Sequence, residues 1–294
     1  MIPAIRKYLA RSNVDGIPTN AQDITLVKTH NGSAHPNKKL VFIVYRPQEA
    51  RPCAVVYSMR PGCDPVAVPA IAETMQGFGP EAPAVLSTGV TPEGPIAVVE
   101  WISDQRLDLN NQLERTSLLS WIQDRITAES DTQKILSLIG YYDELRIHIE
   151  SLGVIIPRQF HDRLMQRLQL HDNPLAAVPQ HGDLQPNNIY HGTQGMRIID
   201  WDDYGNIDFP LFDFFTLYIR CRKIASLRDW ASAAWKSVAM LYKLDTNSLH
   251  LIKALYYLYD FWRKDAVHYA SERPRYFQLS LAQAEQCLDT YDAK

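Results

Sequence analysis

Hydrophobic and polar positions change their pattern about a third of the way along the chain. Before residue 101, β-branched and aromatic residues form short runs separated by polar or proline-containing stretches, a pattern typical of β-strands. We expect strands at residues 24–28, 40–45, 53–59, 84–88 and 95–101. The stretch 46–52 is polar and contains two prolines, so it predicts a turn between the second and third strands.

One helix interrupts this series of strands. Residues 66–78 have a mostly helical pattern, which Gly77 and the pair Gly79-Pro80 bring to an end. The order of elements is then three strands, one helix and two strands. This order predicts a five-stranded antiparallel sheet with one helix.

After residue 101 the amphipathic segments become longer and favour helices. We expect them at residues 117–126, 132–152, 157–170, 213–227, 229–243 and 248–269. In the last of these, Leu251, Leu255, Leu258 and Trp262 recur on one helical face, which indicates packing. The predicted class is α+β, with an N-terminal extension or helix at 1–20, a smaller sheet lobe at 21–101 and a larger, mostly helical lobe at 102–294.

Composition and charge narrow the possible functions. The 294 residues are 46% hydrophobic and 21% charged, as in a soluble globular chain, and the formal net charge is −3. This balance argues against nucleic acid or an anionic membrane as a partner. No apolar run is long enough to span a membrane, and the N-terminus lacks the apolar block of a signal peptide, so we expect a cytoplasmic protein. The pattern indicates no particular oligomeric state.

Cysteine and histidine spacing gives little support to disulfides or zinc. Cys53, Cys63, Cys221 and Cys287 are scattered and form no C-x-x-C pair, so we expect reduced thiols. The nine histidines never occur four residues apart with a carboxylate between them.

One segment carries a recognisable chemistry. Residues 181–213 interrupt the helices with loops and short strands, and loops on a rigid scaffold often hold functional residues. Asp183 and Asn188 have the D-x-x-x-x-N spacing of the protein-kinase catalytic loop, and Asp200 follows twelve positions after Asn188. Phosphoryl transfer needs a carboxylate for the attacking hydroxyl and oxygen ligands for Mg²⁺.

At these positions the chain resembles the aminoglycoside phosphotransferase and choline kinase superfamily. The matching segments read H-G-D-L-Q-P-N-N-I-Y and I-I-D-W-D-D-Y-G-N-I-D-F-P-L-F-D. The resemblance implies a bilobal protein kinase-like fold, ATP and Mg²⁺ as cofactors, and a small hydroxylated molecule as substrate. It also implies that Asp183 is the catalytic base, that Asn188 and Asp200 bind Mg²⁺, and that His181 and Asp213 order the catalytic loop.

The N-terminal lobe departs from the kinase pattern at one position. In that pattern a lysine on the third strand contacts the phosphates and pairs with a glutamate of the following helix. Glu73 fits the glutamate, but Tyr57 stands where the lysine is expected. Lys39 on the preceding strand is one candidate for the missing charge, Lys28 is a poorer one, and Arg60 needs a β-bulge because strand side chains alternate between faces.

Two further segments are nucleotide-binding candidates by resemblance. Gly32 and Ser33 match a phosphate-covering loop, although this loop has one glycine rather than a series. Residues Glu100, Trp101 and Ile102 match the hinge that contacts adenine, and can equally be a strand end with a core Trp.

An acidic group lies near Asn188 and Asp200, which we call the metal motif, and it has two open interpretations. Asp202, Asp203 and Asp208 either form a solvated loop or take part in binding a substrate or a second metal. In the second case the acceptor would be cationic, such as an amino alcohol or an aminosugar.

Three functions remain in competition. The leading one is an ATP- and Mg²⁺-dependent phosphotransferase that acts on the hydroxyl of an amino alcohol, an aminosugar or a related metabolite or antibiotic. The alternative is a catalytically impaired, pseudokinase-like protein that binds a nucleotide or metabolite, because Tyr57 replaces the expected lysine. The third, with least support, is a helical interaction scaffold built on residues 213–294.

Overall fold

The chain forms two compact units. A computed structural model describes residues 1–29, 39–59, 65–128, 134–171, 174–192, 195–207, 209–245, 247–264 and 272–293. The N-terminal unit consists of Met1–Leu107 with Asn187–Asp202, and the C-terminal unit of Asp108–Pro186 with Asp203–Lys294. The division therefore differs from the expected boundaries, because residues 187–202 group with the sheet rather than with the helical lobe.

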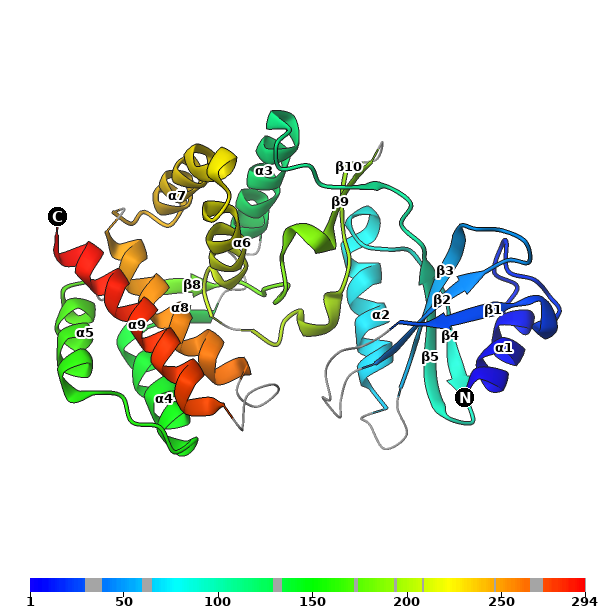
Figure 1. The fold of residues 1–294 in the computed structure, drawn as a ribbon, viewed down its shortest axis with the longest axis horizontal. Coiled ribbons are helices and arrows are strands. Elements are labelled where there is room, and N and C mark those ends of the chain that lie inside the picture. The colour runs from blue at the N-terminus through cyan, green and yellow to red at the C-terminus, as the bar shows by residue number, and fades with distance from the viewer. Residues whose placement is uncertain are drawn as a thin grey trace. The chain divides into compact units, whose positions relative to one another are not determined.

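The N-terminal unit contains the predicted five-stranded antiparallel sheet (Figure 1). Its strands are β1 (Thr25–Lys28), β2 (Leu40–Tyr45), β3 (Pro52–Ser58), β4 (Val85–Thr91) and β5 (Gly94–Glu100). They lie in the order β1-β2-β3-β5-β4. Burial alternates along β2, where Leu40, Phe42 and Val44 face the core, as the period-two pattern of a half-buried strand requires. The five predicted strands are confirmed, with their ends shifted by up to three residues.

Two helices complete the core of this sheet. Helix α2 (Ala67–Phe78) is the predicted one and packs against β4 and β5 (Figure 1). Helix α1 (Ile2–Arg11) inserts Ile5 and Leu9 into the same apolar cluster as Phe42 of the sheet. The first residues of the chain are therefore part of the core of the N-terminal unit.

A second, smaller sheet carries the metal motif. Strands β9 (Ile189–Gly192) and β10 (Gly195–Ile198) pair antiparallel, and the short β6 (Gln105–Arg106) pairs with β9. The strands lie in the order β10-β9-β6. Asn188 and Asp200 therefore flank a hairpin whose register is set by backbone hydrogen bonds.

The C-terminal unit is mostly helical. Its helices are α3 (Gln112–Ala128), α4 (Leu138–Ser151), α5 (Arg158–Leu170), α6 (Phe212–Arg222), α7 (Arg228–Leu241), α8 (Ser248–Lys264) and α9 (Arg273–Asp292). Strands β7 (Lys134–Leu136) and β8 (Leu175–Ala177) form a two-stranded sheet. Among the described helices, none is long and apolar enough to cross a membrane.

Three parts of the C-terminal unit differ from the sequence prediction. The predicted helix 132–152 begins only at Leu138, because residues 134–136 pair with β8. The predicted helix 213–227 ends at Arg222 and is followed by a short 3₁₀ helix. Helix α9 was not predicted, although its buried Phe277, Leu281, Ala284 and Leu288 recur at helical spacing.

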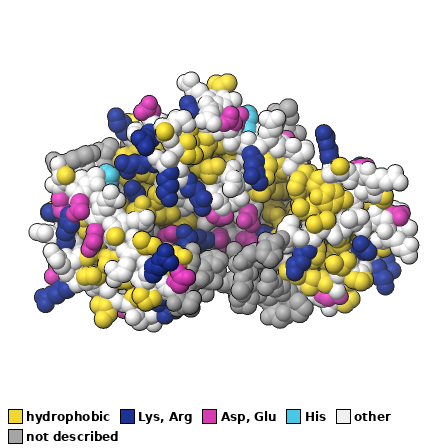
Figure 2. All heavy atoms as spheres, viewed as in Figure 1, with side chains coloured by type: hydrophobic (Ala, Val, Ile, Leu, Met, Phe, Trp, Pro, Cys, Tyr) yellow, Lys and Arg dark blue, Asp and Glu magenta, His cyan; other side chains and the backbone are white. Residues whose placement is uncertain are grey.

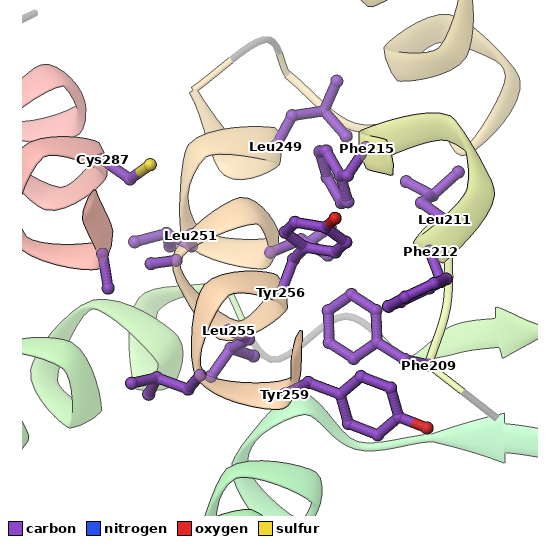
Figure 3. Close-up of a cluster of buried hydrophobic side chains, with 14 of the residues drawn as sticks. Phe209, Leu211, Phe212, Phe215, Leu249, Leu251, Leu255, Tyr256, Tyr259 and Cys287 are labelled. Carbon is purple, nitrogen blue, oxygen red and sulfur yellow. The ribbon is translucent and has the colours of Figure 1, made fainter. Parts of the chain in front are cut away.

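The core of this unit joins α6 to α8 and α9, and α8 and α9 lie side by side (Figures 1 and 3). Aromatic residues of α6 and its leading segment, among them Phe209, Phe212 and Phe215, face Tyr256 and Tyr259 of α8 (Figure 3). The predicted packing face of α8 is confirmed, since Leu251, Leu255 and Leu258 are fully buried. This core fixes the start of α6, whose Asp213 forms hydrogen bonds with the catalytic loop.

Candidate active site

A half-buried aspartate at the start of α6, Asp213, anchors the loop that carries the H-G-D motif. The Asp213 carboxylate accepts the backbone N–H of His181 at 2.5 Å and that of Gly182 at 2.9 Å. The backbone N–H of Asp213 in turn donates to Oε1 of Gln180 at 3.0 Å. These bonds tie three consecutive residues, 180–182, to the first turn of a packed helix, which fixes the loop's position in the C-terminal unit.

Burial opposes the charge of this anchoring carboxylate. Removal from water raises the pKa of Asp213, while the nearby His181 and the N–H groups of His181, Gly182 and Leu184 act against this shift. A buried carboxylate that lost these donors would be left without compensation. The loop and the aspartate therefore depend on each other.

The glycine of the motif has a steric reason. Gly182 has φ +88°, and an added Cβ would lie 2.6 Å from Cβ of Asp203 and 2.7 Å from Cδ1 of Ile207. Both the backbone conformation and the space favour glycine at this position. Protein kinases have arginine at the corresponding position of their H-R-D motif. Here close packing against residues 203 and 207 leaves little space for a side chain at position 182.

Asp183, the predicted base, is half-buried and held by its neighbours. Nε2 of Gln185 donates to Oδ2 of Asp183 at 2.8 Å, and the backbone N–H of Asp183 donates to Nδ1 of His181 at 3.2 Å. His181 itself is buried, so its ring lies inside the loop that it was expected to order. The sequence analysis did not identify Gln185 as a partner of Asp183. Its position two residues after the predicted base was the one indication of this contact.

The predicted metal ligands lie together at one end of the β9–β10 hairpin. Ile189 is opposite Ile198, and the N–H of Ile199 donates to the carbonyl of Asn188 at 2.9 Å, which extends the pairing by one residue. Asn188 and Asp200 therefore flank the same end of the hairpin. Asp200 has φ +70°, a left-handed conformation that Asp tolerates better than most residues.

Trp201 holds this turn against the rest of the N-terminal unit. Its indole Nε1–H donates to the carbonyl of Ile198 at 2.7 Å, and its ring stacks on Phe78 of α2 with centroids 4.0 Å apart. Trp201 is almost fully buried. The aromatic residue after the metal-motif aspartate thus fixes the direction in which Asp200 leaves the hairpin.

Lys39 brings a positive charge to the predicted metal ligand. Its Nζ lies 3.2 Å from Oδ1 of Asp200 and also forms an ion pair with Asp202. The Lys39 side chain is 4% exposed, so this is a buried cation compensated by two carboxylates. Of the candidates for the missing lysine, Lys39 is the one that reaches the metal motif, whereas Arg60 lies outside the described residues.

Tyr57 and Lys39 share one face of the sheet because of the strand register. Val41 is opposite Tyr57, and Lys39 lies two residues before Val41, so Lys39 and Tyr57 are diagonal neighbours. Nζ of Lys39 lies 4.3 Å from the centroid of the Tyr57 ring, a cation–π distance. Burial and the nearby Asp200 raise the pKa of Tyr57, so its phenol stays neutral. The Tyr57 ring thus packs against Lys39, the candidate for the missing charge.

The donor set at the hairpin suits Mg²⁺. The described residues contain no group of three or more His, Cys, Asp or Glu that could hold a metal ion by itself. Asn188 and Asp200 supply an amide and a carboxylate oxygen. Mg²⁺ is usually bound through one or two carboxylates together with substrate phosphates and water, so these oxygen donors fit it.

The other predicted nucleotide-binding residues differ in their surroundings. Glu73 is exposed on α2 and pairs with no described residue, so its expected pairing with the phosphate lysine is not found; Lys39 pairs with the two aspartates instead. Gly32 and Ser33 lie outside the described residues. Trp101 is half-buried and Ile102 buried, directly after β5.

The Glu100 side chain holds strands together. Its carboxylate forms a bidentate ion pair with Arg197 of β10, at 2.7 and 2.5 Å, and accepts the backbone N–H of Ala84 at 3.2 Å. These hydrogen bonds, that of Arg197 first, lower the pKa of Glu100. Because the carboxylate is engaged, the predicted contact of residue 100 with adenine would be made by its backbone groups.

The two described residues of the acidic group each pair with a cation of the chain. Asp202 pairs with Lys39 in the N-terminal unit, and Asp203 pairs with Arg263 of α8 in the C-terminal unit. Asp208 lies outside the described residues. Two of the three carboxylates are thus matched by cations of the chain itself, and a role of this group in binding a cationic acceptor stays a prediction.

Solved structures share this fold along nearly the whole chain. A choline/ethanolamine kinase family protein from Mesorhizobium loti has a TM-score of 0.55 at 16% identity and covers 98% of this chain and 95% of its own. Wild-type aminoglycoside 2'-phosphotransferase-IIIa, in its GDP complex, has a TM-score of 0.52 at 15% identity, with 92% of each chain covered. A glucosamine kinase has a TM-score of 0.52 at 14% identity, with 99% and 87% covered. The fold is the predicted protein kinase-like one.

The sequence itself places the chain in a family. A model described as the phosphotransferase enzyme family matches residues 70–242, more than half of the chain. The protein belongs to this family and is a phosphotransferase. No curated protein sequence matches the chain.

Proposed function

We propose that the protein transfers the γ-phosphoryl group of ATP, with Mg²⁺, to a hydroxyl group of a small molecule. Family membership gives the reaction class, and the contact between Lys39 Nζ and Asp200 Oδ1, at 3.2 Å, carries the proposal further. This contact supplies a cation beside the predicted metal ligand although Tyr57 occupies the usual lysine position. The main reason to expect an impaired enzyme is thereby weakened.

Each residue has a stated role in this reaction. Asp183 accepts the proton of the acceptor hydroxyl, whose oxygen forms a bond to the γ-phosphorus while the bond from that phosphorus to the β-phosphate oxygen breaks and ADP leaves. Asn188 and Asp200 would hold Mg²⁺, which neutralises phosphate charge when bound. Lys39 contacts the phosphates, and Asp213 keeps the catalytic loop in place.

The acceptor belongs to a broad chemical class. The structural neighbours are named as a choline/ethanolamine kinase family protein, an aminoglycoside phosphotransferase and a glucosamine kinase. Their names share a small hydroxylated acceptor, which supports the same class here. Asp202 pairs with Lys39 and Asp203 with Arg263, so these two aspartates give no reason to restrict the acceptor to cations.

A thermal-shift titration tests nucleotide and metal binding first. ATP with Mg²⁺ should raise the unfolding midpoint of the wild-type protein, because a ligand at 100 times its Kd adds about 2.7 kcal/mol of stability. The shift should need Mg²⁺ and should be lost in Asp200→Asn. The matched control Asp15→Asn, an exposed aspartate of the same unit, should keep it.

Release of ADP then tests turnover. We expect it with at least one compound from a panel of amino alcohols, sugars and aminosugars, and not with Asp183→Asn. No Mg²⁺-dependent shift at millimolar ATP would contradict the proposal and favour a pseudokinase-like binding protein. A shift without ADP release by any hydroxylated compound would contradict the acceptor class.

A further inference from the structure

A cavity with a positively charged and aromatic lining lies in the C-terminal unit, among α6, α7, α8 and α9. Its volume is about 550 Å³, within the range of small-molecule sites. Tyr218, Trp235 and Tyr257 contribute aromatic rings to its lining. In the view of Figure 2, Lys and Arg side chains gather over α6 and α7, with apolar side chains between them.

The lining is positively charged. Arg222, Lys223, Lys236 and Lys253 line the cavity together with His250, and no described residue of the lining is an Asp or Glu. Like charges that face one cavity repel each other unless an anion neutralises them. The active-site motif differs in this respect, because its lysine is matched by two aspartates. The described lining therefore carries no negative charge of its own.

Lys253 is the buried cation of this cavity. It is 7% exposed, and within the described part of the chain it has no carboxylate or hydrogen-bond partner. Its Nζ lies 5.4 Å from the ring centroid of Tyr218 and 5.7 Å from those of Trp235 and Tyr257. Burial lowers the pKa of Lys253, Cys287 opposes this shift and Arg222 adds to it. Aromatic faces alone compensate a buried ammonium only in part.

The cavity is separated from the catalytic loop by the length of α6. Asp213 holds the loop at the start of this helix, whereas Arg222 is its last residue. Nine residues of α-helix span about 14 Å. A ligand here would therefore be bound at the opposite end of α6 from the residues that anchor the loop.

We propose that this cavity binds a small organic anion, with a phosphate or carboxylate group held by Lys253 and Arg222 and a flat apolar body packed on Tyr218, Trp235 and Tyr257. The anion provides the negative charge that the lining lacks, and the rings provide the apolar surface. The lining contains none of the residues proposed to bind ATP and Mg²⁺, and the binding measurement needs neither nucleotide nor acceptor.

Isothermal titration with phenyl phosphate tests the proposal. The wild-type protein should bind it saturably, and more tightly than inorganic phosphate, because the ring adds contacts that phosphate alone cannot make. Lys253→Met should bind it about tenfold more weakly or worse, since a charge-assisted hydrogen bond is lost. Removing a buried cation that has no carboxylate partner should leave the unfolding midpoint unchanged or higher.

Two control variants locate the binding. Lys264→Met removes the same charge from the same helix, but Lys264 pairs with Asp260 and does not line the cavity, so its affinity should be that of the wild type. Lys39→Met should also bind phenyl phosphate normally, which excludes binding at the proposed phosphate site. Equal affinities of Lys253→Met and Lys264→Met, or no saturable binding to folded wild-type protein, would overturn the proposal.

The anionic group can belong to the acceptor or to a separate ligand. With an acceptor identified by ADP release, phenyl phosphate should raise its KM at constant kcat if the acceptor places its own anionic group in the cavity. An unchanged KM assigns the cavity to a separate ligand. Inorganic phosphate that binds as tightly as phenyl phosphate would overturn the part of the proposal that concerns the aromatic rings.

Discussion

The catalytic loop and the metal hairpin hold the two halves of the candidate chemistry in different ways. In the loop, backbone N–H groups bind the half-buried Asp213, and an added Cβ at Gly182 would lie too close to Asp203 and Ile207. At the hairpin, a side-chain cation reaches Asp200 from residue 39 instead of residue 57. The lysine can stand on either of two neighbouring strands, because the register places residues 39 and 57 on one face of the sheet. A backbone-anchored loop offers no such exchange, so its sequence follows the family pattern closely.

The largest effect should come from the loop itself. Asp183→Asn should lower kcat by about 10² to 10⁴, because it removes the proton acceptor while the amide oxygen can still accept the N–H of Gln185. The rate of ADP release measures this change. Asp162→Asn, an exposed aspartate on α5, should match the wild type. Comparable turnover of Asp183→Asn would assign the base to another residue.

Moving the lysine from residue 39 back to residue 57 tests whether either strand can supply the cation. Lys39→Met should lower kcat/KM for ATP by about 10², the range found when one preorganised electrostatic donor is removed. The double variant Lys39→Met/Tyr57→Lys should recover part of this loss, because residue 57 lies on the same face of the sheet. Kinetics at varied ATP concentration separate the two outcomes.

The control for this exchange is Lys28→Met. Lys28 is exposed on β1, in the same sheet, and its loss should leave kcat/KM unchanged. A Lys39→Met variant with full activity would show that the proposed cation is not needed. If the double variant recovers no activity, a cation would be effective only at residue 39 and not at residue 57.

The steric argument for the loop predicts a smaller effect on stability. Gly182→Ala should lower the free energy of unfolding by about 1–3 kcal/mol, because alanine disfavours φ +88° and its Cβ would meet Asp203. Gly77→Ala is the matched control: it lies in α2 with nothing within 4 Å of an added Cβ, so it should be neutral or stabilising. Urea denaturation measures both. Equal effects of the two variants would refute the steric argument.

The same contrast explains what could be predicted from the sequence. The sheet, α2 and the anchoring of the catalytic loop follow from local hydrophobic patterns and from contiguous motifs. The approach of Lys39 to Asp200 depends on the β2–β3 register and on the hairpin, which join residues 161 positions apart. The sequence made Lys39 one of several candidates, but only the register selects it.

Other differences have similar causes. Residues 134–136 were assigned to a helix because their local pattern is helical, but pairing with β8 overrides it. The cation partners of Asp202 and Asp203 lie on elements distant in the sequence, so the spacing of these aspartates could not indicate them. The cavity around Lys253 combines three helices and α9, which was not predicted, and no motif marked it.

The smallest effect tests whether Glu100 is structural, unlike Lys39. Hydrogen bonds from Arg197 lower the pKa of Glu100, so the stability that this pair adds is present above the unfolded-state pKa of about 4.3 and is lost as the pH falls through the lower folded-state value. Because the Glu100 side chain is 35% exposed, Glu100→Gln should lower the free energy of unfolding at neutral pH by about 1 kcal/mol or less. It should leave kcat unchanged. Unfolding midpoints measured at neutral pH and near pH 3–4 should converge for wild type and variant on the acidic side, since both then lack the charged pair. A gap that stayed constant with pH would mean that the carboxylate charge contributes nothing and that Glu100 acts by packing alone.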